Sequence, residues 1–511
     1  MHGSIPPLSP PRSRADTARP PGAEPAEDHA LRLVHQLCDA LDRAAIEYCH
    51  WKSTNMIHRS ATGENDLDLL IAASDLDRFS DVLHTQGCWK EVVATGGAQI
   101  PGIRHFYGLD VDSGRLVDIH AHEWLLIGDD ATKNYHLPIE AAYLRSADHE
   151  GLFPIPAPEF EFIVLVVRLM LKHGSPEAIL TGRGRVSSGE RREMDHLSAR
   201  VEPSRIRRAL QDDVPFLDER ILAFSIRALE PGCPIPIRLE AWRALRPRLA
   251  PHARRARPAD VWLQTSRRIG RRFRTRVLGR PARRHLSDGG RVVAIVGGDG
   301  AGKSTTVAEL ARWLSPLAPT VTLHLGKPRR SAAWFVLRGG IRVGRVFGAY
   351  PTWRAAGTPP PGRPNGWSYL WLLTGVLVAR DRSREAARAH ALASRGAIVL
   401  CDRYPLPGTV EIDGPRIDQH QASAMTGLRR RAAGLERATY ARVKPPDAVV
   451  VLRVDADVAV ARRPEADPRL VRSRAEHIRT APWPVGTLVV EADASRERVL
   501  RDVKAGIWTR L

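Results

Sequence analysis

The stretch Arg291-Val-Val-Ala-Ile-Val296, followed directly by Gly297-Gly-Asp-Gly-Ala-Gly302-Lys303-Ser304, decides the fold class of the C-terminal half of the chain. Its first six residues form a continuous apolar run rich in β-branched side chains, which is typical of a strand buried on both faces. The next eight fit the pattern GxxxxGK[ST], and residues 305–314 have helical spacing. This order of strand, glycine-rich loop and helix predicts a P-loop, whose backbone N–H groups curl around a triphosphate.

The chemistry of this loop depends on two side chains at its end. In this motif the lysine, here Lys303, reaches the β- and γ-phosphates of ATP, and the hydroxyl of Ser304 ligates Mg²⁺. ATP and Mg²⁺ are therefore the expected cofactors. The predicted nucleotide-binding residues are Gly297, Gly298, Asp299, Gly300, Ala301, Gly302, Lys303, Ser304 and Thr305.

The sequence after the loop alternates strand-like and helical segments, as in an α/β domain with a parallel sheet. Leu377-Val-Ala-Arg-Asp-Arg382 precedes a helical stretch, and Gly396-Ala-Ile-Val-Leu-Cys-Asp402-Arg403-Tyr404 follows as a strand. Two further strand-like segments are residues 444–455 and 489–494. Taken in order, these motifs resemble thymidylate kinases and related nucleoside-monophosphate kinases over about 220 residues. The resemblance implies that residues 289–511 form a P-loop kinase domain with an α/β/α arrangement.

The resemblance also implies roles for particular side chains. Asp402, at the end of a strand, would bind Mg²⁺ with Ser304, and Asp299 would lie near the sugar of the acceptor. Planar guanidinium groups would bind the acceptor phosphate and close over the transferred group. The residues expected to be catalytic are Lys303, Asp402, Arg403, Arg382, Arg462 and Arg463. The last two begin an Arg-bearing lid that continues with Arg469, Arg472 and Arg474, of which Arg469 is the chief further candidate.

Three departures from the family pattern fall on the acceptor side. Val296 stands where many thymidylate kinases have glutamate, and Leu325-Gly-Lys327-Pro328-Arg329-Arg330 stands where they usually have Arg-Glu-Pro-Gly. Residues 331–366 form a Trp-, Pro- and Gly-rich insertion. The acceptor therefore stays open: a nucleotide, with thymidine monophosphate (dTMP) as one candidate, or another small phosphorylated or hydroxylated molecule.

A second constellation lies in the N-terminal half. The segment Tyr48-Cys-His-Trp-Lys52-Ser53 is followed by Asp66-Leu-Asp68, and a third acid, Asp118, lies in a strand-like segment. The pattern resembles the nucleotidyltransferase superfamily, which implies an α+β domain over residues 29–150. Carboxylates at alternate strand positions point to one face, so Asp66, Asp68 and Asp118 are predicted Mg²⁺ ligands. Lys52 departs from the usual glycine, and His120 and His122 either tune this site or are ordinary polar residues of the strand face.

The remaining segments differ in composition. Residues 1–28 are rich in Pro, Ala and Arg and predict a disordered leader, while residues 151–250 have helical periodicity and predict a helical extension. Residues 251–288 are an Arg-rich linker helix. Its apolar stripe over 260–278 either packs between domains or contacts an anionic membrane surface peripherally.

The net charge of +20 is high, but eight of the 77 basic residues are lysines and twelve arginines fall within residues 251–285. This Arg bias is poor evidence for a nucleic-acid partner, and none is expected. Five scattered cysteines and the lack of an apolar targeting segment indicate a cytoplasmic protein. The leading hypothesis is an ATP- and Mg²⁺-dependent phosphotransferase. Two alternatives are a nucleotidyltransferase using the N-terminal acids and a non-catalytic, nucleotide-sensing scaffold.

Overall fold

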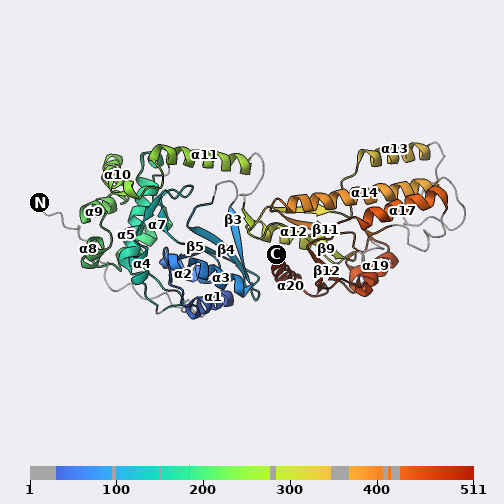
Figure 1. Ribbon diagram of the computed structural model, residues 1–511, viewed down its shortest axis with the longest axis horizontal. Helices are drawn as coiled ribbons and strands as arrows, with labels where there is room; N and C mark the ends of the chain where they lie inside the picture. Colours follow the sequence, from blue (N-terminus) through green and yellow to red (C-terminus); the bar gives the residue numbers. More distant parts are fainter. Residues whose placement is uncertain are drawn as a thin grey trace. The chain divides into compact units, whose positions relative to one another are not determined.

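The computed structural model describes residues 30–94, 99–149, 151–182, 184–276, 284–346, 367–406, 413–415 and 426–511. The chain divides into two compact units, Met1–Ala282 and Arg283–Leu511 (Figure 1). The predicted leader at 1–28 and residues 347–366 of the predicted insertion lie outside the described residues.

The C-terminal unit is built on a parallel sheet. Its strands are β9 (Arg291–Gly297), β10 (Thr320–His324), β11 (Ile398–Asp402), β12 (Ala448–Arg453) and β13 (Leu488–Glu491), in the order β10-β11-β9-β12-β13. The P-loop strand β9 is thus at the centre, where the chain reverses its direction of winding. In open sheets of this kind, ligands bind at the carboxyl ends of the strands beside such a reversal. The predicted α/β class with a parallel sheet is confirmed for this half.

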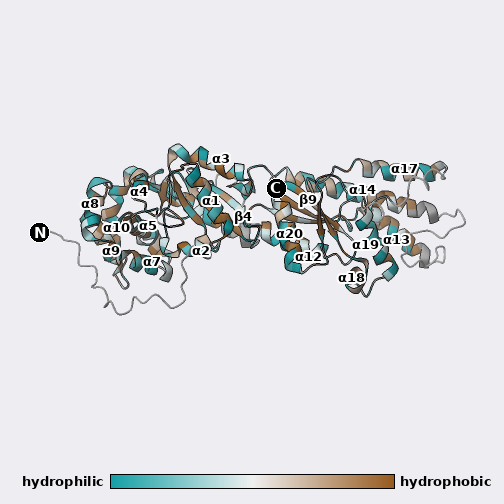
Figure 2. Cartoon of the chain, turned by 90° about the horizontal axis from the view of Figure 1, so that it is seen from below, coloured by the Kyte–Doolittle hydropathy of each residue, from teal (hydrophilic) through white to brown (hydrophobic). Residues whose placement is uncertain are grey.

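Helices cover both faces of that sheet. Among the described residues of the unit, the helices are α12 (Lys303–Leu314), α13 (Ala332–Val346), α14 (Trp367–Ala393), α17 (Gly427–Ala441), α18 (Ala456–Ala461), α19 (Pro468–Thr480) and α20 (Arg496–Trp508). A short strand, β8 (Arg284–Leu286), precedes β9. Alternate residues of β9 join a hydrophobic cluster with Ala386 and Ala389 of α14. Figure 2 shows hydrophobic residues concentrated in β9, which is buried on both faces as its sequence predicts.

The N-terminal unit contains a mixed sheet. Its strands are β1 (Tyr48–His50), β2 (Leu67–Ile71), β3 (Trp89–Ala94), β4 (Ile103–Leu109) and β5 (Leu116–His122), in the order β1-β2-β5-β4-β3, and β6 (Leu125–Ile127) pairs with β7 (Tyr135–Leu137). Only β2 and β5 run parallel among the pairs described within this unit. Alternate residues of β2 and β5 enter a core with α1 (Arg32–Arg43) and α3 (Leu76–Gln86).

The rest of the N-terminal unit is mostly helical. The helices are α2 (Ile57–Ala61), α4 (Glu140–Arg145), α5 (Pro158–Leu169), α6 (Pro176–Leu180), α7 (Ser188–Ser198), α8 (Pro203–Asp212), α9 (Glu219–Ala228) and α10 (Ile235–Leu249), with a π-helical turn at Met170–Gly174. One hydrophobic core combines α5 and α10 with Trp51 and Leu70 from the sheet region. The predicted domain boundary near residue 150 therefore falls between segments that share one hydrophobic core.

The Arg-rich segment contains α11 (Arg257–Arg276). Arg267 donates to the backbone oxygen of Ala131 at 2.6 Å, and Arg268 forms an ion pair with Asp129. Two apolar residues of the stripe, Trp262 and Ile269, are exposed. The helix is therefore anchored through its arginines, and membrane contact by its apolar residues stays a prediction.

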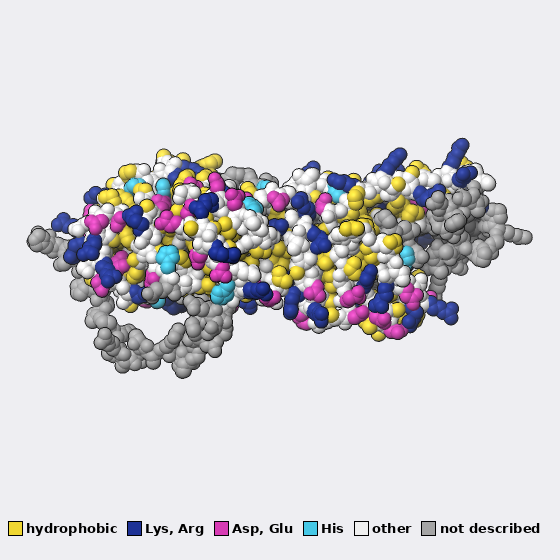
Figure 3. Space-filling model, turned by 60° about the horizontal axis from the view of Figure 1, so that its bottom comes forward, with side chains coloured by type: hydrophobic (Ala, Val, Ile, Leu, Met, Phe, Trp, Pro, Cys, Tyr) yellow, Lys and Arg dark blue, Asp and Glu magenta, His cyan; other side chains and the backbone are white. Residues whose placement is uncertain are grey.

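No helix in the described part of the chain is long and apolar enough to cross a bilayer. On the face drawn in Figure 3, basic and acidic side chains are interspersed over both units. The high net charge does not gather into one basic patch on that face.

Candidate functional site

The P-loop of the C-terminal unit is shaped by glycines with positive φ. Gly302 (φ +81°) precedes the first turn of α12, and Gly300 (φ +82°) lies so close to α18 that a Cβ would be 2.9 Å from the backbone oxygen of Ala459. Lys303 is buried, and its Nζ donates to the oxygen of Gly298 at 2.6 Å. Burial, assisted by the charge of Arg403, lowers the pKa of Lys303 to about 8. A buried ammonium group beside a helix N-terminus is suited to an anionic ligand.

Asp402 lies at the carboxyl end of β11, beside the end of β9 in the parallel register. The Ser304 hydroxyl donates to its Oδ2 at 2.8 Å. Its Oδ1 is buried and has no hydrogen-bond partner among the described residues. A hydroxyl and a carboxylate with an unused oxygen are ligands that Mg²⁺ prefers, so the residues present fit the ion.

Arg403 follows with a left-handed backbone (φ +70°), which is unusual for a residue other than glycine. Its Nη2 is 2.9 Å from Oδ1 of Asp299, whose Oδ2 is 2.6 Å from Nη1 of Arg474 on α19. Burial raises the pKa of Asp299, but the hydrogen bond from Arg474 and the charge of Arg403 outweigh it and lower the pKa. The Arg403 side chain also passes over Gly326, where a Cβ would be 2.3 Å from its Cδ.

Arg382 projects from α14 and is buried. Its Nε donates to the Leu325 oxygen, its Nη1 to the Asp413 backbone oxygen and to the Tyr440 hydroxyl, and its Nη2 to Asp413 Oδ1 at 2.9 Å. All three nitrogens are thus engaged by protein groups. In this arrangement Arg382 positions Asp413 and the chain after β10.

The arginines predicted for the lid make different contacts. Arg462 donates to the oxygens of Gly300 and Ala492, so it holds the P-loop from the end of α18. Arg463 is exposed and pairs with Glu465 at 3.0 Å. Arg469 is exposed and does not line the cavity, whereas Arg474, five residues further along α19, does.

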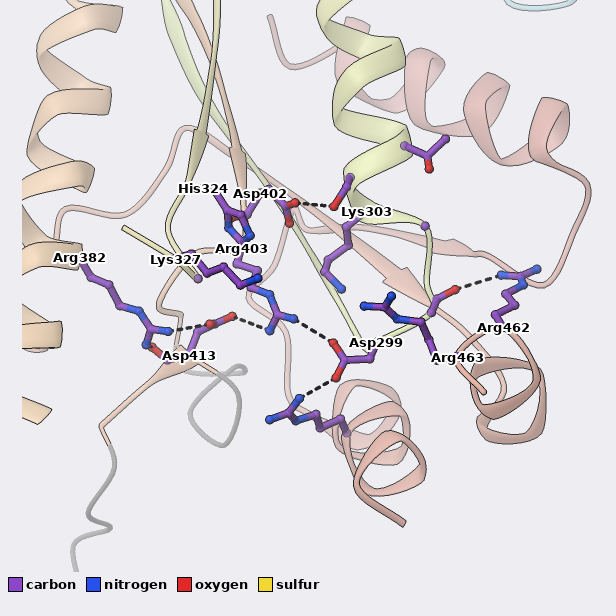
Figure 4. A pocket seen from close by; sticks show the side chains of 16 residues that line it. Asp299, Lys303, His324, Lys327, Arg382, Asp402, Arg403, Asp413, Arg462 and Arg463 are labelled. Carbon is purple, nitrogen blue, oxygen red and sulfur yellow. Dashed lines mark hydrogen bonds and ion pairs between the residues drawn. The ribbon is translucent and has the colours of Figure 1, made fainter. Parts of the chain in front are cut away.

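A cavity of about 550 Å³ joins these groups. Figure 4 shows Lys303 pointing between Asp402, Arg463 and Asp299, with Arg382 and Asp413 at one side. Gly297, Gly298 and Ala301, from the predicted nucleotide set, shape the loop without lining the cavity. The lining residues are Asp299, Gly300, Gly302, Lys303, Ser304, Thr305, His324, Gly326, Lys327, Arg382, Asp402, Arg403, Asp413, Arg462, Arg463 and Arg474.

The predicted acids of the N-terminal unit gather on the polar face of its sheet. His120 Nδ1 is 3.4 Å from Asp68 Oδ1, and its Nε2 is 3.5 Å from Asp118 Oδ2 and 3.7 Å from Asp66 Oδ2. The imidazole thus lies among the three carboxylates predicted to bind metal. Burial lowers the pKa of His120, but the neighbouring Asp118 and Asp68 outweigh burial and raise it to about 9.

The turn before these acids is held by carboxylates of the helical part. Ser53 (φ +56°) donates from its hydroxyl to Glu193, and Thr54 donates from both its N–H and its hydroxyl to Glu161. Lys52 Nζ contacts Asp68 Oδ1 at 2.8 Å. The donors that would cradle a phosphate at this turn are therefore used by Glu161 and Glu193.

Glu161 provides a pH-dependent test of this arrangement. Burial, only partly offset by Thr54, raises the pKa of this carboxyl to about 7. Because the folded state holds the proton more tightly than the unfolded chain does, stability should fall as pH rises from about 4.5 to 7. Glu161→Gln mimics the protonated form. We expect its free energy of unfolding to exceed that of the wild type by on the order of 2 kcal/mol at pH 8 and to match it near pH 5. Calorimetric unfolding of both proteins at the two pH values measures this, and a constant difference would contradict it.

The chain is similar to a curated protein and to solved structures of known proteins. The chain is 31% identical over 185 residues to the "Uncharacterized ATP-binding protein YghS" of Escherichia coli strain K12, covering 34% of this chain and 74% of that protein. No protein-family model matches the chain.

Two of the similar solved structures are of kinases. A deoxyadenosine kinase from M. mycoides with bound dATP is 15% identical, with a TM-score of 0.26, and covers 42% of this chain and 98% of that chain. The thymidylate kinase of Candida albicans is 14% identical, with a TM-score of 0.27, and covers 43% and 90%. These TM-scores are too low to support a fold assignment, which therefore depends on the strand order and the P-loop of the chain itself.

Proposed function

The chain belongs to the family of the ATP-binding protein YghS, and on this premise we propose that it is an ATP- and Mg²⁺-dependent phosphotransferase acting through its C-terminal unit. One observation carries the proposal: Lys303 and Ser304 of the P-loop open onto the same cavity as Asp402 and Arg403 of the neighbouring strand. Phosphoryl transfer needs this combination of positioned cations and a metal-binding carboxylate more than it needs covalent chemistry.

The proposed roles follow from the geometry. Backbone N–H groups at the start of α12 bind the triphosphate, and Lys303 neutralises charge on its terminal phosphates. Ser304 and Asp402 would hold Mg²⁺, which when bound supplies further neutralisation of the phosphate charge. Arg403 and Arg474, both paired to Asp299, would stabilise the transferred group.

The acceptor would enter beside Lys327 and His324, which line the cavity next to Arg403 (Figure 4). These groups suit a small phosphorylated or hydroxylated molecule. The resemblance to thymidylate kinases makes dTMP the first candidate to test.

The decisive experiment gives the full chain γ-labelled or α-labelled ATP together with dTMP and other phosphorylated and hydroxylated acceptors. Transfer of the γ-label, identified by mass spectrometry of the product, is the expected result. Tight ATP binding without any labelled product would instead favour a nucleotide-sensing scaffold and contradict the phosphotransferase.

A second candidate is nucleotidyl transfer in the N-terminal unit. Its support is the convergence of Asp66, Asp68 and Asp118 around His120. Incorporation of the α-label with release of pyrophosphate, lost in Asp66→Asn and Asp68→Asn and retained in Lys303→Met, would identify this activity.

Arg474 offers a test of the acceptor side of the cavity. We expect Arg474→Ala to lower turnover about tenfold, because Asp299 loses one of its two guanidinium partners and Arg403 shifts. Arg469→Ala is the matched control on the same helix, since Arg469 lies outside the cavity. Steady-state kinetics compare the two, and equal turnover in both variants would contradict the role of Arg474.

A further inference from the structure

The polar face of the N-terminal sheet carries imidazole groups as well as carboxylates. Asp68 of β2 is directly opposite His120 of β5, and His122 follows two residues later on the same face. One ligand atom from each of the three lies within 4.8 Å of the other two. Adjacent strands therefore bring two imidazoles and one carboxylate to a single point.

His122 is the unusual member of this group. It is 2% exposed, packs edge-on against Trp51 at 5.0 Å, and neither ring nitrogen has a hydrogen-bond partner among the described residues. Its Nε2 is 3.5 Å from Asp68 Oδ1. Buried polar groups are nearly always hydrogen-bonded, so an imidazole buried beside a carboxylate at this longer distance has a ring nitrogen that a ligand between the two groups would satisfy.

We propose that Asp68, His120 and His122 bind a divalent transition-metal ion of the Zn²⁺ class. Imidazole nitrogens favour Zn²⁺ and its neighbours in the transition series, whereas Mg²⁺ prefers an all-oxygen set. Three protein ligands leave a coordination position open. This assignment is independent of the phosphotransferase reaction, since its residues lie in the other unit.

The surroundings of His120 support the assignment. Its Nδ1 faces Asp68, while its Nε2 faces Asp118 at 3.5 Å. A metal-bound histidine typically donates its other N–H to a carboxylate, which fixes the tautomer and orients the ring. Asp118 thus acts as a positioning residue for His120 in this site.

Lys52 occupies the position that the ion would compete for. Its ammonium lies 2.8 Å from Asp68 Oδ1, the oxygen nearest to His122 Nε2. The cation already present shows that the carboxylate attracts positive charge, and metal binding would displace it. Removal of this competitor should therefore strengthen binding of the ion.

The test titrates the EDTA-treated full chain with Co²⁺, followed by its visible absorption, and with Zn²⁺ in competition. We expect one ion per chain, at least tenfold weaker binding in His122→Phe and His120→Ala, and tighter binding in Lys52→Met. His122→Phe keeps the buried ring volume, and a gain of affinity in Lys52→Met cannot result from misfolding. The exposed His196, changed to Ala, is the control for surface binding.

Two results would overturn the proposal. One is Co²⁺ affinity in His122→Phe equal to that of the wild type. The other is Lys52→Met affinity that is unchanged or lower. Mg²⁺ alone, titrated calorimetrically under the same conditions, distinguishes this site from the all-carboxylate site of the nucleotidyl-transfer candidate: binding of Mg²⁺ as tight as that of Zn²⁺ would reject the transition-metal assignment.

Discussion

Lys303→Met should lower phosphotransferase turnover on the order of 10²–10³-fold, equivalent to about 3–4 kcal/mol of transition-state stabilisation. The reason is that the Nζ of Lys303 is buried at the start of α12, where water cannot replace its charge. Methionine keeps the length of the side chain and removes the charge. The measurement is the initial rate of γ-phosphate transfer at saturating ATP and Mg²⁺.

Loss of activity by misfolding can be separated from loss of chemistry at this position. The pKa of Lys303 is lowered to about 8, chiefly by burial, so the charged form of this side chain destabilises the folded state. Removal of the charge should not destabilise the unit, and Lys303→Met should unfold near the wild-type temperature. A variant that unfolds normally and transfers phosphate at the wild-type rate would refute the proposed reaction.

Asp402→Asn is expected to reduce turnover by about 100-fold and to raise the Mg²⁺ concentration needed for half-maximal rate. The substitution keeps the shape of the side chain and an oxygen that can accept the hydrogen bond from Ser304. It removes the negative charge from the carboxylate whose Oδ1 has no hydrogen-bond partner among the described residues. Rates measured across a Mg²⁺ titration give both quantities.

The control for Asp402 is Asp457→Asn. Asp457 is an exposed acid of the same unit that pairs with Arg472 at 2.6 Å, and it does not line the cavity. Its variant should follow the wild-type Mg²⁺ curve. Identical curves for Asp402→Asn and Asp457→Asn would exclude Asp402 from metal binding.

The donor side of the C-terminal site could be predicted because its determinants are local. Strand, loop and helix are consecutive, so the order of residues 291–314 fixes the path of the chain around Lys303. Asp402 could be assigned to the same site because it ends β11, which runs parallel to β9 and ends at the same edge of the sheet. The convergence of Asp66, Asp68 and Asp118 was predicted in the same way, from alternation on adjacent strands.

The acceptor side depends on contacts that local spacing does not encode. Arg382 was predicted to bind a phosphate, yet its nitrogens are engaged by Leu325, Asp413 and Tyr440, which are far from it in sequence. The stretch over residues 462–474 offers both Arg469 and Arg474 as lid arginines, and of these two only Arg474 lines the cavity. The orientation of α19 determines which arginine of that helix meets Asp299, and the apolar spacing of Val471, Ala475 and Ile478, which places Arg474 on the buried side, is the signal that could have identified it. His324 is the last residue of β10, as Asp402 is the last residue of β11. The same argument from the carboxyl ends of parallel strands would therefore have identified His324 as a site residue.

The close approach of Arg403 to Gly326 restricts how the acceptor preference of this protein could be re-engineered. Saturation mutagenesis at position 327 can vary the charge and size of a cavity-lining side chain. The same library at position 326 would instead lose catalytic competence across its members, since any side chain there meets the Cδ of Arg403. Directed evolution toward new acceptors should therefore diversify residue 327 and keep its glycine neighbour constant.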